Sequence, residues 1–142
     1  MTQIIRDMLE ISRCGVQYRS DYLAPMGLKS IHASYLTEVC ANPGISQDKL
    51  ARLICINKSN VARQAAVLEE GGFITRTPAP DDKRGLGLYP TEKTLALMPR
   101  ITQINSAWEG CLTRELTGEE MELLSVLLAK MKARAGTWME NH

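Results

Sequence analysis

The strongest constraint on the fold is a pair of helix signals joined by a very short connection between residues 46 and 70. Ser46 precedes a helical pattern over Gln47–Ile54, and Asn57 precedes a second one over Lys58–Glu70. Ser and Asn are favoured at helix N-termini because their side-chain oxygens accept a hydrogen bond from a free backbone N–H group. The sequence therefore predicts two helices separated by a tight turn. The residues expected on their buried faces are Leu50, Leu53, Ile54, Val61, Ala65 and Leu68.

A β-hairpin is predicted directly after the second helix. Gly71-Gly72 ends that helix, since glycine readily adopts the left-handed conformation found after helix C-termini. Residues 73–77 are the best strand candidate in the chain, residues 78–84 form a turn-rich polar loop, and residues 85–89 form a returning strand. Two helices, a tight turn and a hairpin are the pattern of a winged helix-turn-helix.

Longer helical patterns flank this segment on both sides. On the N-terminal side they span Met1–Tyr22 and a helix from Ser30, the expected cap, to about Cys40. The residues expected on one face of each are Ile5, Met8, Leu9, Ser12 and Val16 in the first and Ile31, Tyr35, Leu36 and Val39 in the second.

On the C-terminal side, a long helical stretch starts at Thr91 and a last helix runs from Glu119 to about Ala135. Thr117 and Glu120 fit the capping box that precedes many helices. The outer helices are apolar over more length than one small domain can cover, which predicts a homodimer.

The predicted fold class is mainly α with a small β-hairpin wing: a winged helix-turn-helix flanked by N- and C-terminal dimerisation helices. One domain spans residues 1–142. Its winged helix-turn-helix occupies about residues 30–90, and its dimerisation helices occupy about residues 1–22 and 91–138.

Composition narrows the functional class. The chain has 142 residues, 44% of them hydrophobic and 23% charged, which is typical of a single globular domain. Arg6, Asp7 and Glu10 interrupt the N-terminus where a signal peptide needs an apolar core, so we expect a cytoplasmic protein without a membrane partner. The four cysteines, which form no CxxC pair, are expected to be free thiols, most of them buried: Cys14, Cys40, Cys55 and Cys111.

The outer face of the second helix of the pair carries side chains suited to DNA. Arginine can read guanine and asparagine or glutamine can read adenine, and the first turn of a helix offers free N–H groups to phosphate. Residues 49–63 contain four basic residues and no acidic one, although the net charge of the whole chain is only +1. A solvated polar helix face is the alternative interpretation. The candidate contacts are Lys58, Ser59, Asn60, Arg63 and Gln64.

The loop between the predicted strands carries Asp81-Asp82-Lys83-Arg84. Arg84 at the tip of a hairpin could enter a narrow minor groove, with Lys83 beside it, and an aspartate could hold its guanidinium by a bidentate pair. An ordinary polar turn is the alternative, because aspartate and lysine are common in turns.

The chain resembles the MarR family of bacterial transcription regulators over essentially its whole length. The resemblance rests on Ile45–Ala51, Lys58–Arg63, Leu68–Ile74, the wing signature Asp82-Lys83-Arg84, and Thr91–Lys93. It implies a homodimer that binds a pseudo-palindromic operator in double-stranded DNA and represses transcription. Carried over by position, the implied contacts are Ser59, Asn60 and Arg63 in the recognition helix, Arg84 in the wing with Asp82 as its partner, and Ser46 and Gln47 at phosphates.

Some positions depart from the family pattern. Pro90, Thr91 and Thr94 stand where the family often has Leu, Thr and a Gly three residues after the Thr, and Lys29-Ser30 replaces the usual Thr at the cap of the second helix. Asn60 and Ala62 stand where Thr is frequent. These changes bear on helix entry and base preference more than on the fold.

The resemblance also implies release from DNA by a small ligand, often aromatic or phenolic, bound between the dimerisation helices and the winged helix. The candidate lining residues are Arg13, Tyr18, His32 and Tyr35, although both tyrosines could be core or interface residues. Some relatives instead sense oxidants through a cysteine on the first helix, which makes Cys14 a redox candidate. A buried structural thiol is the favoured interpretation of Cys14.

Other classes have less support. His32 and His142 are the only histidines, and they form no metal-binding motif. The chain shows no Cys/His dyad or phosphate-binding loop, so we expect neither an enzyme nor a cofactor. A winged helix that binds another protein instead of DNA is an alternative function.

Overall fold

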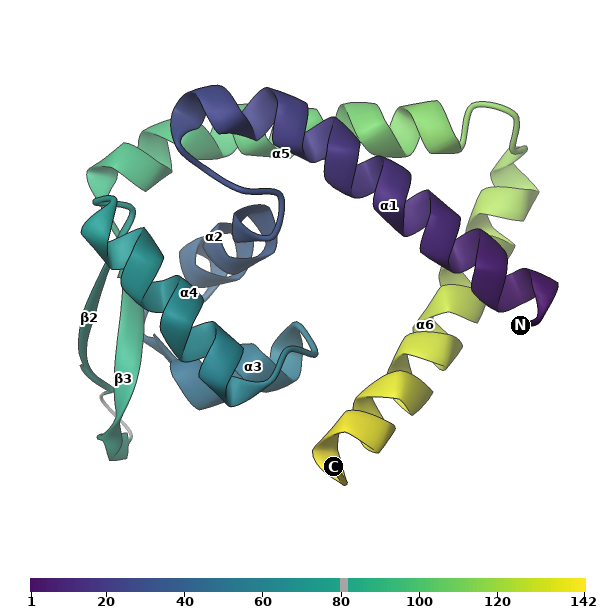
Figure 1. Ribbon diagram of the computed structural model, residues 1–142. Coiled ribbons are helices and arrows are strands. Elements are labelled where there is room, and N and C mark those ends of the chain that lie inside the picture. Colours follow the sequence, from purple (N-terminus) through teal and green to yellow (C-terminus); the bar gives the residue numbers. More distant parts are fainter. Residues whose placement is uncertain (80–81) are drawn as a thin grey trace.

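The computed structural model describes the backbone of residues 1–79 and 82–142, and the side chains of residues 1–78 and 85–142. A lobe of short helices and a small sheet lies beneath two long helices, and a third long helix descends from their far end (Figure 1). This arrangement confirms the predicted fold class. The elements are α1 Gln3–Leu23, η1 Ala24–Met26, α2 His32–Ala41, β1 Ile45–Ser46, α3 Gln47–Leu53, α4 Lys58–Glu70, β2 Ile74–Ala79, β3 Asp82–Pro90, α5 Glu92–Leu112 and α6 Gly118–Glu140.

The predicted capping residues fix the starts of three helices. Ser46 Oγ accepts from the Lys49 amide at 3.1 Å and caps α3. Asn57 Oδ1 accepts from the Asn60 amide at 2.8 Å and caps α4. At α6, both halves of the predicted capping box are present, with the Thr117 hydroxyl and the Glu120 carboxylate each accepting from the other residue's backbone.

The start of α2 differs from the prediction. Ser30 was expected to cap this helix, but its hydroxyl accepts a hydrogen bond from Arg19 Nε at 3.0 Å instead. The backbone amide of Lys29 donates to His32 Nδ1 at 2.9 Å, and the His32 amide donates back to the Lys29 carbonyl at 3.0 Å. His32 therefore takes the place that the Glu of a capping box takes.

The sheet has a third strand that the sequence did not reveal. The strand order is β1-β3-β2, and Ile45 and Ser46 of β1 pair antiparallel with Leu88 and Gly87 of β3. The predicted polar loop over residues 78–84 is wrong in extent, because β2 runs to Ala79 and β3 begins at Asp82. Pro78, which lacks an N–H group, is tolerated because β2 is an edge strand, and the register shifts after it.

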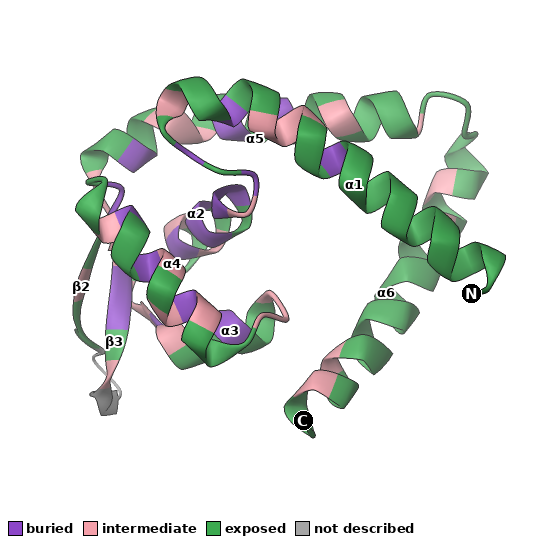
Figure 2. Ribbon diagram, viewed as in Figure 1, coloured by how far each residue is buried: buried purple, intermediate pink, exposed green. Residues whose placement is uncertain are grey.

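The core fills the lobe between α2, α3, α4, the sheet and the part of α5 that contains Ile101 and Ile104 (Figure 2). Leu50, the three predicted residues of α4 and three of the four predicted residues of α2 are buried. Leu53 was expected to be buried but is 44% exposed, because it borders an open cavity lined mainly by α2 and the end of α3. Ile31 and Ile54 are half-buried at the edge of the core.

The long helices are covered over little of their length. In α1 only Gly15 and Leu23 are buried, and Gly15 lies where a Cβ atom would come within 3.0 Å of Trp108 Nε1 of α5. In α6 no residue is buried (Figure 2). None of the helices in the described part of the chain combines the length and apolar character needed to cross a membrane.

The four cysteines are free thiols, but the expectation that most are buried is wrong. Cys14 and Cys111 are exposed on the long helices, and Cys40 and Cys55 are half-buried. Little of the surface of the long helices is covered in the single chain. Residues on them are therefore exposed even where the spacing of apolar side chains predicts a buried face.

Cys55 has an unusual backbone conformation, with φ of 57°. It follows the end of α3, where the Ile56 amide donates to the Ala51 carbonyl and the Cys55 amide donates to the Arg52 carbonyl. This is a Schellman motif, which requires a left-handed residue at the position of Cys55. At the end of α4 the corresponding residue is Gly72, with φ of 79°.

Cys55→Gly is therefore expected to stabilise the protein. A left-handed non-glycine residue costs about 1–2 kcal/mol, and the extra freedom of glycine in the unfolded chain offsets about 0.5–1 kcal/mol of that gain. We expect a net gain of up to about 1.5 kcal/mol in urea or thermal unfolding. Cys14→Gly, at an exposed position in the interior of α1, is the control and should lower stability by about 0.5–1 kcal/mol. A loss of stability in Cys55→Gly would contradict the strain argument.

Candidate nucleic-acid interface

Helix α4 lies across the front of the lobe with the stripe of Val61, Ala65 and Leu68 against the core and its opposite side exposed (Figures 1 and 2). Of the predicted contact residues on it, Lys58, Ser59 and Arg63 are exposed, and Asn60 is half-buried. Ser59, Asn60 and Arg63 therefore lie on the side of α4 turned away from its buried stripe, and Lys58 lies in its first turn.

Hydrogen bonds orient this face before any DNA arrives. Arg63 Nη2 donates to the side-chain oxygen Oδ1 of Asn60 at 3.1 Å, and the backbone N–H of Asn60 donates to Oδ1 of the capping residue Asn57. Ser59 Oγ donates to Asn57 Oδ1 at 2.9 Å. A guanidinium held in this way loses less conformational freedom when its remaining N–H groups form a bidentate contact with a base.

The first turn of α4 has local positive charge. Lys58 Nζ lies 3.4 Å from Asp48 Oδ2, but their side chains are 69% and 55% exposed. Such a surface pair contributes little stability, so Lys58 can exchange Asp48 for a phosphate at small cost. Because surface charges are screened beyond about 8 Å, this local charge matters more for binding than the net charge of the whole chain.

The predicted phosphate contacts before α3 are engaged within the protein. Ser46 is buried and its hydroxyl caps α3. Gln47 is half-buried, and its side-chain oxygen accepts from Arg76 Nη1 at 3.3 Å. Gln64 is also half-buried, and its Oε1 lies 2.8 Å from His32 Nε2.

Arg76 joins the wing to both helices of the pair, which sequence reasoning missed. From β2 it donates through Nη2 and Nε to Glu69 Oε1 of α4 at 3.0 and 3.2 Å, and its backbone amide donates to Glu69 Oε2 at 3.1 Å. The hydrogen bond from Arg76 lowers the pKa of Glu69 below its usual value. These bonds, with the one to Gln47, hold the hairpin at a fixed position relative to the recognition helix.

The side chains of Asp82, Lys83 and Arg84 lie outside the described residues. The backbone places them at the start of β3, on the strand that returns from the hairpin tip.

The four candidate ligand residues do not form one site. Arg13 is exposed on α1. Tyr18 stacks on Trp108 of α5, with ring centroids 5.0 Å apart, and lies 4.9 Å from the Tyr22 ring. His32 and Tyr35 are buried in the lobe, where burial raises the pKa of Tyr35 and its hydroxyl has no hydrogen-bond partner among the described residues.

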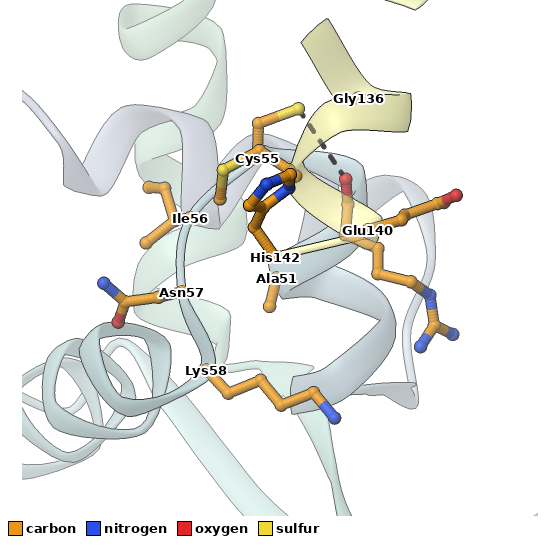
Figure 3. A pocket seen from close by; sticks show the side chains of 10 residues that line it. Ala51, Cys55, Ile56, Asn57, Lys58, Gly136, Glu140 and His142 are labelled. Carbon is orange, nitrogen blue, oxygen red and sulfur yellow. Dashed lines mark hydrogen bonds between the residues drawn. The ribbon is translucent and has the colours of Figure 1, made fainter.

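Cavities occur elsewhere between the lobe and the long helices. One of about 440 Å³ lies between the α3–α4 turn and the C-terminal end of α6, with Cys55, Lys58 and His142 around it (Figure 3). Another, of about 590 Å³, lies at the junction of α1 and α2 and is lined by Arg19, Lys29, three serines and four apolar residues. None of the four candidate ligand residues lines either cavity.

Cys14, the redox candidate, is exposed on α1 rather than buried as favoured from sequence. The ring of Tyr18, one turn further along α1, is occupied by its contacts with Trp108 and Tyr22. Among the described residues, no three histidine, cysteine, aspartate or glutamate side chains are grouped so as to hold a metal ion.

A helix-turn-helix with a polar, basic recognition face and a β wing pinned to it defines a winged-helix DNA-binding protein. The sequence profile of the MarR family matches residues 31–86 of this chain. The uncharacterized HTH-type transcriptional regulator YybA of Bacillus subtilis is 30% identical over 132 residues, which cover 93% of this chain and 88% of YybA. The chain belongs to the MarR family of DNA-binding transcriptional regulators.

Solved structures agree over nearly the whole chain. The crystal structure of the transcriptional regulator SlyA superposes with a TM-score of 0.92 at 30% identity and 98% coverage of both chains. A MarR-family regulator from Listeria monocytogenes, solved in complex with a 26mer DNA, superposes with a TM-score of 0.91 at 27% identity, covering 98% of this chain and 93% of that one.

Proposed function

We propose that this protein is a homodimeric, sequence-specific repressor that binds a pseudo-palindromic operator and is released by a small aromatic or phenolic ligand. The observation that carries the proposal is the pre-oriented face of α4, where Asn60 holds Arg63 toward solvent. The DNA complex of the Listeria relative supports the same mode of binding.

In this proposal, the residues of α4 divide into two roles. Arg63 and Asn60 read base edges in the major groove, with Ser59 small enough to allow close approach. Lys58 neutralises a phosphate near the N-terminus of α4. Ser46 and Gln47 contribute mainly by ordering the start of α3, where free backbone N–H groups can meet a phosphate. Lys83 and Arg84 of the wing are assigned to the minor groove, with Asp82 supporting Arg84.

A dimer follows from the apolar side chains left on the long helices. In α6, Leu123, Val126, Leu127, Leu128 and Met131 are each more than 40% exposed, and Ile4 and Ile11 of α1 are similar. Contiguous apolar surface on this scale marks an interface rather than a free surface. A second copy of the chain would cover it and set two recognition helices apart at a fixed spacing.

A small ligand suits the cavity at the junction of α1 and α2. Arg19 and Lys29 supply positive charge beside the apolar side chains of Leu28 and Ile31. An aromatic acid or phenolate fits this combination, and its binding there would change how α1 meets the lobe.

Selection of bound fragments from the source genome tests this function. The retained fragments should share two inverted half-sites whose centres are about one helical turn, 10–10.5 base pairs, apart. A panel of benzoates and phenols should then contain a compound that lowers operator affinity at least tenfold. Retention of no DNA would favour the protein-interaction alternative, and equal retention of all DNA would refute sequence-specific binding.

A further inference from the structure

His32 connects the start of α2 to the recognition helix. It is 1% exposed, and both of its ring nitrogens are engaged. Nδ1 accepts from the backbone amide of Lys29 at 2.9 Å, and Nε2 lies 2.8 Å from Oε1 of Gln64, which is on α4 next to Arg63.

The chemistry of these partners fixes the tautomer of the ring. A backbone N–H group can only donate, so Nδ1 must present its lone pair to Lys29. The single proton of the neutral ring is then on Nε2, where it is donated to the Gln64 oxygen. Both contacts are satisfied only by this one neutral tautomer.

We propose that His32 is a positioning residue that holds recognition helix α4 against α2 through Gln64, so that operator binding depends on the neutral state of His32. The proposal rests on the function proposed above. It assigns Gln64, a predicted base contact, to a contact within the protein instead.

Protonation of His32 would break this arrangement. A second proton on Nδ1 would face the Lys29 N–H group, so two donors would meet where one donor and one acceptor now lie. Two charged or titratable groups face the ring: Lys29, at the same helix start, and Tyr35, whose ring is edge-on with its centroid 6.5 Å away. The positive charge of Arg63 on α4 acts on Tyr35, where it opposes the rise in pKa that burial causes. Burial and the positive charge of Lys29 lower the pKa of His32, while the bond to Gln64 opposes them.

The direction of the pH dependence follows. Above the unfolded-state pKa of about 6.5 the ring is neutral in both states and its contacts contribute fully. As the pH falls below that value, the unfolded chain takes up the proton first, and the stabilisation is lost down to the lowered pKa of the folded state. Operator affinity should fall at lower pH still, around and below the lowered pKa of the folded state, because the ring in the folded protein becomes charged only there. A purely electrostatic effect of the added positive charge would instead raise affinity for DNA.

The first test is NMR titration of the two histidine rings in the free protein, with His142→Gln used for assignment. His32 should titrate below 6.5. Gln64→Glu should raise its pKa, because a carboxylate favours the charged ring, and Gln64→Leu should lower it. A His32 pKa above 6.5, or one unchanged by both substitutions, would overturn the clamp. Since this test needs no DNA, it stands apart from the proposed function.

The second test is operator affinity from pH 7.5 down to one unit below the His32 pKa found by NMR, measured with a selected operator. The wild type should bind about tenfold more weakly at the acid end, whereas His32→Asn, which keeps an acceptor for Lys29 but cannot reach Gln64, should bind about fivefold more weakly at pH 7.5 and show little pH dependence. Gln64→Leu should behave like His32→Asn, and Gln103→Leu on α5 is the matched control. Wild-type affinity that stays constant or rises on acidification would overturn the positioning role. Absence of any operator binding at pH 7.5 would instead refute the proposed function.

Discussion

Arg63→Ala is expected to cause the largest loss of operator affinity of any single change on α4. A bidentate contact between arginine and guanine contributes about 1–3 kcal/mol of discrimination, and a dimer would lose it at both half-sites. We expect affinity for the selected operator to fall at least tenfold and affinity for random DNA to fall much less. Asn60 would also lose the hydrogen bond from Arg63 at 3.1 Å, so in Arg63→Ala its side chain is no longer held in place by that bond.

Two further variants separate charge from geometry. Arg63→Lys keeps the positive charge but cannot form the planar bidentate contact, so it should lose specificity while keeping the salt dependence of binding. Arg114→Ala removes an equal charge from the connection between α5 and α6, far from the lobe in Figure 1, and should leave specificity intact. Fluorescence anisotropy with operator and scrambled DNA at several salt concentrations measures both quantities. Equal effects of Arg63→Ala and Arg114→Ala would refute base reading by Arg63.

Local chemistry explains the parts of the fold that the sequence predicts. The caps at Ser46, Asn57 and Thr117 depend on residues within three positions of each other, so their spacing is visible in the sequence. The glycine pair after α4 is visible for the same reason. The start of α2 was predicted incorrectly because either the Ser30 hydroxyl or the His32 ring could accept a backbone N–H group there. Arg19, which lies 11 residues before Ser30, donates to the Ser30 hydroxyl, and a contact at that distance is not visible in the local sequence.

Contacts between distant segments explain most of what was missed. Strand β1 has only two residues and is defined by its pairing with β3, so no periodic pattern in the sequence predicts it. Arg76 is one of many basic residues in the sequence, and its role depends on Glu69 and on Gln47, 29 residues away. Gln64 has the spacing of a base contact on α4, but only the fold brings His32 close enough to engage it.

Leu127→Glu is expected to abolish tight operator binding without unfolding the single chain. Leu127 is 47% exposed and lies on α6 in line with Leu123 and Met131, one turn away on either side. Because no residue of α6 is buried within the chain, a charge at this position disturbs no core. It would place a carboxylate from each copy within the apolar surface proposed for the dimer, and the cost of desolvating two unpaired charges opposes association.

The expected result is a particle of 15.8 kDa in sedimentation, in place of one of about twice that mass, with unchanged helical circular dichroism. Loss of the second recognition helix removes the gain from bivalent binding, which is about 10²–10⁴-fold. Affinity for a single half-site should change far less than affinity for the full operator. Ser125→Glu adds the same charge on the opposite side of α6 and should keep the dimer. If Leu127→Glu remains dimeric and binds the full operator as tightly as Ser125→Glu does, the apolar stripe of α6 is not the dimer interface.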